Sequence, residues 1–354
     1  MKKLLKGLLC AVSIILVLVL LLLELPFNFT FGSKNKQHVS VMGDNIENMS
    51  AHVTDIAMLG AHDAFSSKVG MFSAVDPAED EDSMLNAGYG WLVRGFTVRF
   101  ARAQNKSAKG LLRGGVRYLD VRLSWADGKW YNKHGLLGAP FEDNLKETIA
   151  FLNDNAGEFI IFDMQHTYTG ESSFEALFNY LNEVKVDGKS LIDHIHYDAS
   201  ATELKDLTYG DVTENGASAG VVVLIPPEGH AAMPAVSYDR DENCRSVWHN
   251  KMKDGEMLSA IAAEHEKIAA TDEYDGMIRV NQAQKTLVLS GSNMGQIVFG
   301  WSLMDMANRF NKKLSRHDDF SAWLETTPVF MVDFATSRHC DSALRFIGEH
   351  NKAL

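Results

Sequence analysis

The sequence predicts an α/β fold in which parallel strands form a sheet that is covered by helices. From Ala51 to the C-terminus, short apolar runs alternate with segments of helical periodicity, which is typical of parallel sheets with helices outside. The chain has 354 residues and a hydrophobic content of 46%, which suffices for one large core. No repeat or linker is visible in this part of the sequence. We therefore expect a single domain, and periodicity alone leaves a closed barrel and an open sheet as alternatives.

The predicted elements can be placed in chain order. Strands are expected where short runs of apolar, β-branched and aromatic residues occur, at 56–59, 116–123, 158–164, 221–225, 286–289 and 328–333. Helices are expected where apolar residues recur at helical spacing, after 143, around 174–181, at 256–270 and at 341–350. Residues 141–144 open the first of these helices, with Asp143 or Asn144 as its N-cap, and Gly157 ends it.

The N-terminus carries a candidate membrane anchor. Three lysines precede an uncharged run from Gly7 to Leu23, which is just long enough to span roughly 30 Å of hydrocarbon. The run is longer than a usual signal-peptide core, and no A-x-A-like cleavage site follows it. We expect an uncleaved transmembrane anchor over 1–25, with the lysines cytosolic and the body extracytoplasmic. A polar stalk over 26–50 and one folded domain over 51–354 would follow. A cleaved signal, and hence a secreted protein, is the alternative.

The composition excludes several kinds of partner. A net charge of −12 and the lack of a basic stripe argue against a nucleic-acid partner. An acidic body also requires any membrane contact to rest on apolar and aromatic side chains. Of the three cysteines, Cys10 lies in the apolar segment, and the pairing of Cys244 with Cys340 stays open. The sequence has no C-x-x-C or H-E-x-x-H pattern, so we expect no zinc site.

A hairpin pattern around residues 116–134 carries charged residues. An alternating strand is followed by an Asp-Gly turn and a second short strand that ends at His134. The period of two places Arg117 on one face of the first strand, and Asp120 with Arg122 on the other. Two charges on one face of an otherwise apolar strand are costly unless they are paired or functional. From the strand alone, a structural ion pair on a solvated face remains an alternative.

A second motif lies upstream, where a short apolar run ends in a small-residue turn that carries His62 and Asp63. Taken in order, the turn LGAHDAF, the strand GVRYLDVRL and the nearby KHG resemble the catalytic X domain of phosphatidylinositol-specific phospholipase C. The resemblance is nearest to the small, metal-independent bacterial enzymes and to the trypanosomal enzyme that cleaves glycosylphosphatidylinositol anchors. Residues 91–105 look like the trypanosomal enzyme in particular.

The resemblance implies a fold and a reaction. Members of that family fold as a distorted TIM-type (β/α) barrel. His62, Asp163 and Asp333 lie at or just past the C-terminal ends of predicted parallel strands, the end at which barrels keep their chemistry. The implied reaction cleaves the phosphodiester between diacylglycerol and inositol, because the inositol 2-hydroxyl attacks phosphorus and leaves a cyclic phosphate. A phospholipid at a membrane surface would be the substrate.

The resemblance also implies roles for five residues. His62 would be the general base and His134 the general acid, since an ordinary histidine pKa of about 6.5 allows either protonation state. Arg122 would lie against the phosphate, where a guanidinium gives bidentate hydrogen bonds. Asp63 would assist the acid, and Asp333 would hold the far nitrogen of His62 and fix its tautomer.

Four further residues are expected to bind substrate around this group: Asp120, Asp163, Gln165 and Gln282. The chain departs from the family pattern at the headgroup. After the strand 221–225, the relatives carry a basic residue that touches the inositol ring, whereas this chain continues Pro-Pro-Glu. Gln165 stands where the bacterial enzymes have a lysine. Inositol specificity is therefore open, and a related phosphoric diester hydrolase acting on another headgroup is an alternative.

The same resemblance bears on metal dependence. Animal phospholipases C of this superfamily hold calcium at the phosphate, whereas the matching strand here offers the fixed cation of Arg122, which would repel calcium. We expect neither a metal nor a cofactor. A metal-dependent glycerophosphodiester phosphodiesterase is a rival, but the stretch after His62 lacks the carboxylate cluster it would need. The other rival is a membrane-tethered barrel that binds inositol lipids or glycans without activity.

Overall fold

The computed structural model describes residues 2–28, 38–79, 85–86, 90–288 and 302–354. Its centre is a curved sheet in which eight strands run parallel in the order β7-β6-β5-β2-β1-β10-β9-β8. Their bounds are β1 Met58–Ala61, β2 Val116–Ala126, β5 Phe159–Tyr168, β6 Gly220–Ile225, β7 Tyr238–Asp239, β8 Cys244–Trp248, β9 Ile278–Gln282 and β10 Val329–Val332. Within the described residues, β7 and β8 are the two edges of the row of parallel strands. The sheet therefore forms an α/β half-barrel. This confirms the coarse part of the expected TIM-type fold, which is parallel strands with helices outside.

A hairpin extends one central strand beyond the sheet. Strand β3 (Lys129–His134) pairs antiparallel with the end of β2, and β4 (Leu136–Pro140) pairs with β3. The turn between β2 and β3 is the predicted Asp127-Gly128 pair, and both residues have positive φ, of 48° and 74°, as a two-residue hairpin turn requires. The hairpin returns His134 toward the carboxyl ends of the parallel strands.

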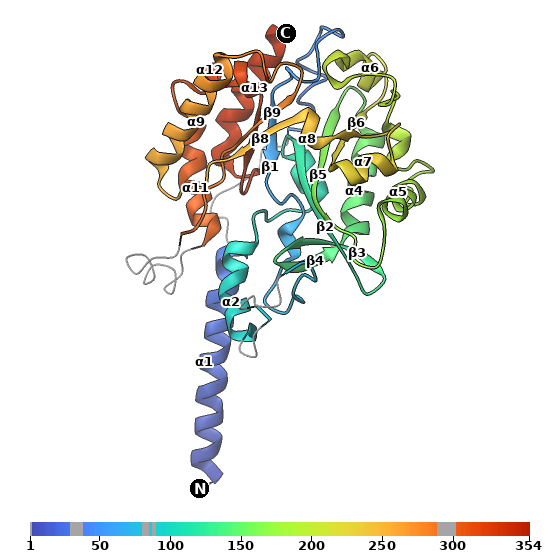
Figure 1. Ribbon diagram of the computed structural model, residues 1–354. Coiled ribbons are helices and arrows are strands. Elements are labelled where there is room, and N and C mark those ends of the chain that lie inside the picture. Colours follow the sequence, from blue (N-terminus) through green and yellow to red (C-terminus); the bar gives the residue numbers. More distant parts are fainter. Residues whose placement is uncertain (1, 29–37, 80–84, 87–89, 289–301) are drawn as a thin grey trace.

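Most of the helices cover the outside of the sheet (Figure 1). They are α3 Ala108–Arg113, α4 Phe141–Asp154, α5 Phe174–Glu183, α6 Tyr209–Thr213, α7 Pro227–Ala232, α9 Asp254–Ala269, α11 Leu303–Leu314, α12 Phe320–Thr326 and α13 Asp341–Ala353. Helix α2 (Gly90–Ala101) lies below the sheet, beside the N-terminal helix, and the short helix α8 (Arg240–Asn243) connects β7 to β8. Strand alternation separates two cores. Leu119 and Phe162 face the helices, whereas Tyr118, Ile161 and Met331 fill the interior of the half-barrel.

Two predicted elements are placed differently in the structure. The strand expected at 286–289 is wrong for residues 286–288, which are irregular, while residue 289 lies outside the described residues. The strand there is β9, whose apolar run is interrupted by Arg279 and Asn281; both are buried and partnered, Arg279 by Asp55. The helix expected to open within residues 141–144 begins at Phe141, but its expected N-cap is wrong, because Pro140 and not Asp143 or Asn144 holds that position. The Asn144 side chain accepts a hydrogen bond from the Ala108 N–H rather than capping its own helix.

The N-terminal segment forms helix α1 (Lys2–Asn28), which projects away from the body (Figure 1). In the described ranges, no helix combines the length and the apolar character needed to cross a bilayer; the anchor stays a prediction. Residues 38–50, expected to belong to a stalk, pack onto the body, because Val41 and Met42 are buried and their N–H groups donate to Glu158. The folded domain therefore begins before the expected boundary at residue 51.

Candidate active site

Two neighbouring strands bring a histidine and a carboxylate together. His62 follows β1 and Asp333 follows β10, and these strands pair directly. His62 Nδ1 lies 2.7 Å from Asp333 Oδ1. The buried side chain of Gln104 fixes both strand ends, because its Nε2 donates to the carbonyls of His62 and Val332 at 2.9 Å each. The predicted contact between His62 and Asp333 is therefore present, and the backbone at both ends is held in place.

Asp63 sits below the two histidines in a left-handed turn with a φ of 42°. Its backbone N–H donates to Asp120 Oδ2 at 3.0 Å, which holds this strained conformation. The side chain is 2% exposed and contacts three partners. Its Oδ2 lies 2.7 Å from His134 Nδ1 and 3.5 Å from His62 Nε2, and its Oδ1 lies 2.6 Å from Arg122 Nε. Asp63 thus contacts His62, His134 and Arg122, three of the residues predicted to be catalytic.

Arg122 points to the interior of the half-barrel from β2. Its Nε and Nη2 donate to the two oxygens of Asp120 at 3.2 and 3.1 Å, and Asp120 is fully buried. The Arg122 side chain keeps 19% of its surface exposed. The predicted alternative of an ion pair on a solvated face is wrong, because the carboxylate is buried and the guanidinium lines a cavity.

His134 completes the group from the end of β3. The ring centroids of His62 and His134 lie 5.9 Å apart, with the rings edge to face. His134 Nδ1 faces two acceptors, Asp63 Oδ2 at 2.7 Å and the Ala101 carbonyl at 2.8 Å. A ring nitrogen between two acceptors must carry the proton, so the other nitrogen, Nε2, is the one left for chemistry in the cavity.

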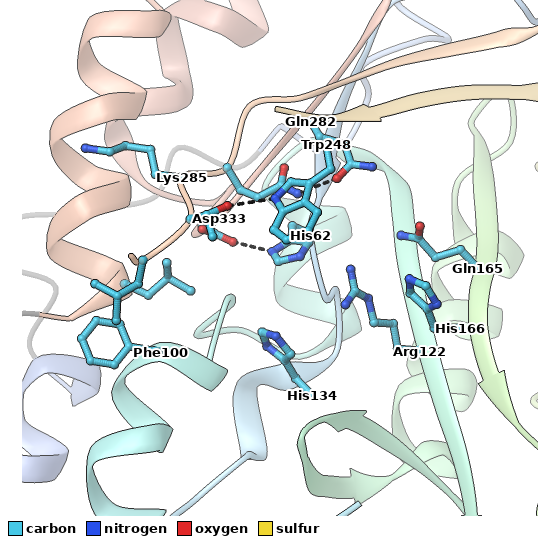
Figure 2. Close-up of a pocket in the computed structure, with 14 residues that line it drawn as sticks. His62, Phe100, Arg122, His134, Gln165, His166, Trp248, Gln282, Lys285 and Asp333 are labelled. Carbon is cyan, nitrogen blue, oxygen red and sulfur yellow. Dashed lines mark hydrogen bonds and ion pairs between the residues drawn. The ribbon is translucent and has the colours of Figure 1, made fainter. Parts of the chain in front are cut away.

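The cavity between these residues has a volume of about 350 Å³ (Figure 2). His62, Arg122, His134 and Asp333 line one part of it. The remaining wall carries the polar side chains of Gln165, His166, Gln282, Gln284, Lys285 and Thr286, while Phe100, Trp248, Leu287 and Leu303 provide apolar surface. Such a site can hold a ligand with a phosphate, a polar ring and an apolar part.

Charge controls the protonation states of the group. Burial lowers the pKa of His62, but the neighbouring carboxylates of Asp63 and Asp333 outweigh burial and raise it to about 8. Burial raises the pKa of Asp63, but Arg122 and the two histidines outweigh burial and leave it below its ordinary value. Burial raises the pKa of Asp333. The carboxylate pair Asp63 and Asp120 in turn raises the pKa of Arg122 despite burial.

The predicted substrate-binding residues divide into two groups. Gln165 and Gln282 line the cavity. Asp120 and Asp163 do not, because both are fully buried behind its wall. Asp163 accepts hydrogen bonds from the Tyr118 hydroxyl and, at 2.8 Å, from Arg240 Nε. Asp120 and Asp163 therefore do not line the described cavity, since protein partners occupy both carboxylates. Their expected contact with substrate stays a prediction.

Three residues around the site were not predicted. Trp248, at the end of β8, is 57% exposed and lines the cavity, and its Nε1 donates to Thr286 Oγ1 at 2.9 Å. Lys285 also lines the cavity, and Arg240 contacts Asp163 beneath it. No local pattern marked them, because Trp248 ends a short edge strand, Lys285 lies in a loop and Arg240 begins a helix of four residues. An isolated tryptophan in an otherwise polar segment was the one available signal for Trp248.

Three residues around Arg122 carry the kinds of ligand atom that a cation site needs. Ligand atoms of His62, Asp63 and Asp120 all lie within 4.8 Å of one another. However, the Arg122 guanidinium is bound to both carboxylates, at 2.6 Å and 3.1 Å. A cation would have to displace a positive group that is held by two charges, so these residues do not fit a metal while Arg122 is in place. Metal independence stays a prediction.

Comparisons with known proteins were made for the sequence and for the fold. No family model matches the chain. The variant-surface-glycoprotein phospholipase C of Trypanosoma cruzi is 35% identical over 130 residues, which are 34% of this chain and 34% of that protein. The mouse PI-PLC X domain-containing protein 3 is 32% identical over 125 residues, which are 34% of this chain and 39% of that protein. The aligned regions thus span little more than a third of these curated relatives.

Solved structures match over much more of the chain. The phosphatidylinositol-specific phospholipase C of Listeria monocytogenes superposes with a TM-score of 0.60 over 90% of this chain and 100% of that structure, at 16% identity. A mutant of the Staphylococcus aureus enzyme gives 0.57 over 87% and 98%, also at 16% identity.

The fold and the site together define a parallel α/β half-barrel with two histidines and an arginine at the carboxyl ends of its strands. The chain is similar in sequence to members of the phosphatidylinositol-specific phospholipase C X-domain family, and it has the fold of the bacterial phosphatidylinositol-specific phospholipases C.

Proposed function

We propose that this protein cleaves the phosphodiester of phosphatidylinositol-type lipids by internal attack. The observation that carries the proposal is the convergence of His62, His134 and Arg122 on one cavity, with Asp63 in contact with all three. His62 removes the proton of the headgroup 2-hydroxyl, whose oxygen then bonds to phosphorus. The bond from phosphorus to the diacylglycerol oxygen breaks, and His134 protonates that oxygen. The products are diacylglycerol and a cyclic phosphodiester.

The tautomers required by this mechanism agree with the contacts. Asp333 accepts from His62 Nδ1 at 2.7 Å, which places the proton on Nδ1 and leaves Nε2 as the base. His134 Nδ1 carries a proton toward Asp63, so a protonated His134 can release the proton on Nε2. Arg122 supplies a fixed positive charge for the phosphoryl oxygens, where preorganised donors are most effective.

The decisive experiment is product analysis by phosphorus NMR. Vesicles of phosphatidylinositol, and separately of glycosylated phosphatidylinositol, are incubated with the full chain in the presence of a chelator. A cyclic phosphodiester product is expected. A phosphate monoester that forms without a cyclic intermediate would contradict internal attack. Turnover that the chelator abolishes would favour the metal-dependent rival, and vesicle binding without turnover would favour the inactive binding barrel.

A related hydrolase that acts on another headgroup is the second candidate. One observation favours it: strand β6 is followed by Pro226 and Pro227, neither of which offers a charged side chain to an inositol ring. Turnover of a panel of glycerophospholipids beside phosphatidylinositol distinguishes the two candidates.

We also propose that the protein is anchored by its N-terminus, with the catalytic domain outside the cytoplasm. The proposal rests on the apolar run of α1, in which side chains such as Leu8 and Ile15 are exposed. A bilayer would remove this apolar surface from water. Retention of the full chain in the membrane fraction after alkaline extraction is expected. Release of the full chain would leave the secreted alternative.

A further inference from the structure

A series of contacts continues beyond the cavity wall to Arg240, the first residue of α8. Arg240 donates from Nε to Asp163 Oδ1 at 2.8 Å and from Nη2 to Gln165 Oε1 at 3.1 Å. Gln165 donates from Nε2 to Asp120 Oδ1 at 2.5 Å, and Asp120 accepts from Arg122. Polar contacts thus join Arg240 without a break to the guanidinium that lines the cavity.

The Gln165 amide is oriented by the charges at its two ends. A carboxamide has an acceptor end and a donor end, and its partners decide which way it points. Arg240 has only donors, so it selects the oxygen end. Ionised Asp120 has only acceptors, so it selects the NH₂ end. Without Arg240, the oxygen end of the amide loses this donor, and the contact with Asp120 alone has to hold the Gln165 side chain in place.

Arg240 also neutralises a charge that has no access to water. Asp163 is fully buried between Arg240 and the Tyr118 hydroxyl. Arg240 itself is 15% exposed, and it is not among the described residues that line the cavity. It therefore reaches the site through Gln165 and not by touching a ligand.

The fold explains why this guanidinium comes from so distant a place in the sequence. Strand β7 pairs with the end of β6, so that Asp239 is the partner of Ile225. Arg240 follows Asp239 directly, just as Pro226, which has no charged side chain, follows Ile225 at the end of β6. The segment after strand β7 thus places a guanidinium next to the end of β6, where the chain has no positive side chain of its own.

We propose that Arg240 is a positioning residue for the reaction proposed above. It fixes the Gln165 amide so that Nε2 holds Asp120, and Asp120 in turn holds Arg122 in place at the phosphate. The inference rests on the proposed function for its kinetic consequence, but its structural part can be measured without turnover.

The first experiment compares Arg240→Met with Arg245→Met in the full chain. Arg245 is a matched control, because it makes a partly buried ion pair with Glu264 at 2.8 Å from β8 and lies outside the described cavity lining. The Arg240 variant should lower kcat on phosphatidylinositol vesicles about 10–100-fold with little change in KM, as the loss of an outer partner does. The control should change kcat by less than about twofold. Equal effects of both variants would overturn the proposal.

The second experiment tests the route through Gln165. If Arg240 acts by orienting this amide, Arg240→Met should have almost no further effect on kcat in a Gln165→Leu background. An undiminished effect in that background would overturn the relay. If Arg240→Met does not fold, Arg240→Lys keeps the charge beside Asp163 but lacks the planar fork that reaches both partners. It should lower kcat in the native background and not in the Gln165→Leu background.

The third measurement needs no substrate. The Nε–H resonance of Arg122, assigned by its disappearance in Arg122→Lys, should shift or broaden in Arg240→Met and stay unchanged in Arg245→Met. An unchanged resonance in Arg240→Met would overturn the proposal. A shifted resonance in a protein that does not turn over phosphatidylinositol would contradict the proposed function and leave the positioning contact standing.

Discussion

Strand β2 carries two arginines on opposite faces, and both are bound to carboxylates. Arg117 faces the helices and is completely buried. It donates to Glu158 Oε2 at 2.6 Å and to the carbonyls of Leu112, Val116 and Val39. The second oxygen of Glu158 accepts backbone N–H groups of residues 41–43. The donors of this guanidinium are directed at protein acceptors, which is how a buried charge can be tolerated.

Arg122 faces the interior of the half-barrel and is held differently. Two carboxylates, Asp63 and Asp120, contact it from below, while part of its surface opens to the cavity. Arg117 is thus shielded from any ligand, whereas Arg122, on the same strand, can contact a ligand in the cavity. Of the two arginine–carboxylate pairs on β2, the one that adjoins a cavity and other titratable groups is therefore the one that indicates function.

The largest expected effect concerns the two histidines at the open site. His62→Ala and His134→Ala should each lower kcat about 10²–10⁴-fold, because each removes an acid or base from the reaction. Because the two act in one step, the double variant should be little worse than either single variant. Vesicle assays measure the rates, and thermal unfolding verifies that each variant is folded. Additive losses in the double variant would contradict joint action.

The next effect separates the two arginines directly. Arg122→Met should lower kcat about 10²–10³-fold, as the loss of a charge-stabilising donor does, and it should also lower Tm, because the buried carboxylates of Asp63 and Asp120 lose their common cation. Arg117→Met should also destabilise the fold, by about 3–5 kcal/mol, because Glu158 is left buried without its partner, but the folded fraction should keep its kcat.

Denaturant unfolding of both variants measures their stability, and single-turnover rates measure whether the folded Arg117 variant keeps the activity that the Arg122 variant loses. Arg117→Met with Glu158→Gln should recover part of the stability, since glutamine keeps an acceptor for the N–H groups that Glu158 binds. A loss of kcat in the folded Arg117 variant would break the distinction between the two faces.

A smaller effect follows from the pKa of His62, which is raised from 6.5 to about 8. The base must be neutral, so kcat/KM should rise with pH through about 8. Asp333→Asn removes one of the charges that raise this pKa, and the midpoint of the rate profile should move toward 6.5.

The free energy of unfolding should change with pH in the opposite direction to the rate. Protonated His62 adds about 2 kcal/mol of stability below pH 6.5, and this contribution is lost as pH rises through 8. Rate profiles and unfolding at pH 6 and 9 measure both, and a midpoint that stays in place would contradict the role of Asp333.

The predictability of the site depends on how local each signal is. His62 with Asp63 and the hairpin before His134 were predictable, because a turn after a short apolar run and an Asp-Gly pair between strands are encoded within a few residues. Alternation along β2 also predicted the opposite faces of Arg117 and Arg122, since the side-chain period is fixed by the backbone.

Other features depended on contacts between distant segments. Strand β9 was missed because Arg279 interrupts its apolar run, and its charge is tolerated only through Asp55, which lies far away in the sequence. Arg240 follows a strand of two residues, which leaves no periodicity to detect. The positions of Asp120 and Asp163 behind the cavity wall depend on register between strands, which the sequence of one strand does not contain.

Metal ions should have the weakest effect on kcat, because Arg122 stands where a metal ion would otherwise bind. Ligand atoms of His62, Asp63 and Asp120 lie close enough together for a cation, so only the Arg122 guanidinium distinguishes this site from a metal centre. Excess chelator or added calcium should change kcat by less than about twofold, because the fixed cation already occupies both carboxylates. Arg122→Ala removes that cation and leaves Asp63 and Asp120 unpaired, so calcium should bind this variant and raise its Tm. Calorimetry with calcium on both proteins provides the measurement, and binding to the unmodified chain would contradict the assignment of Arg122 as the cation of the site.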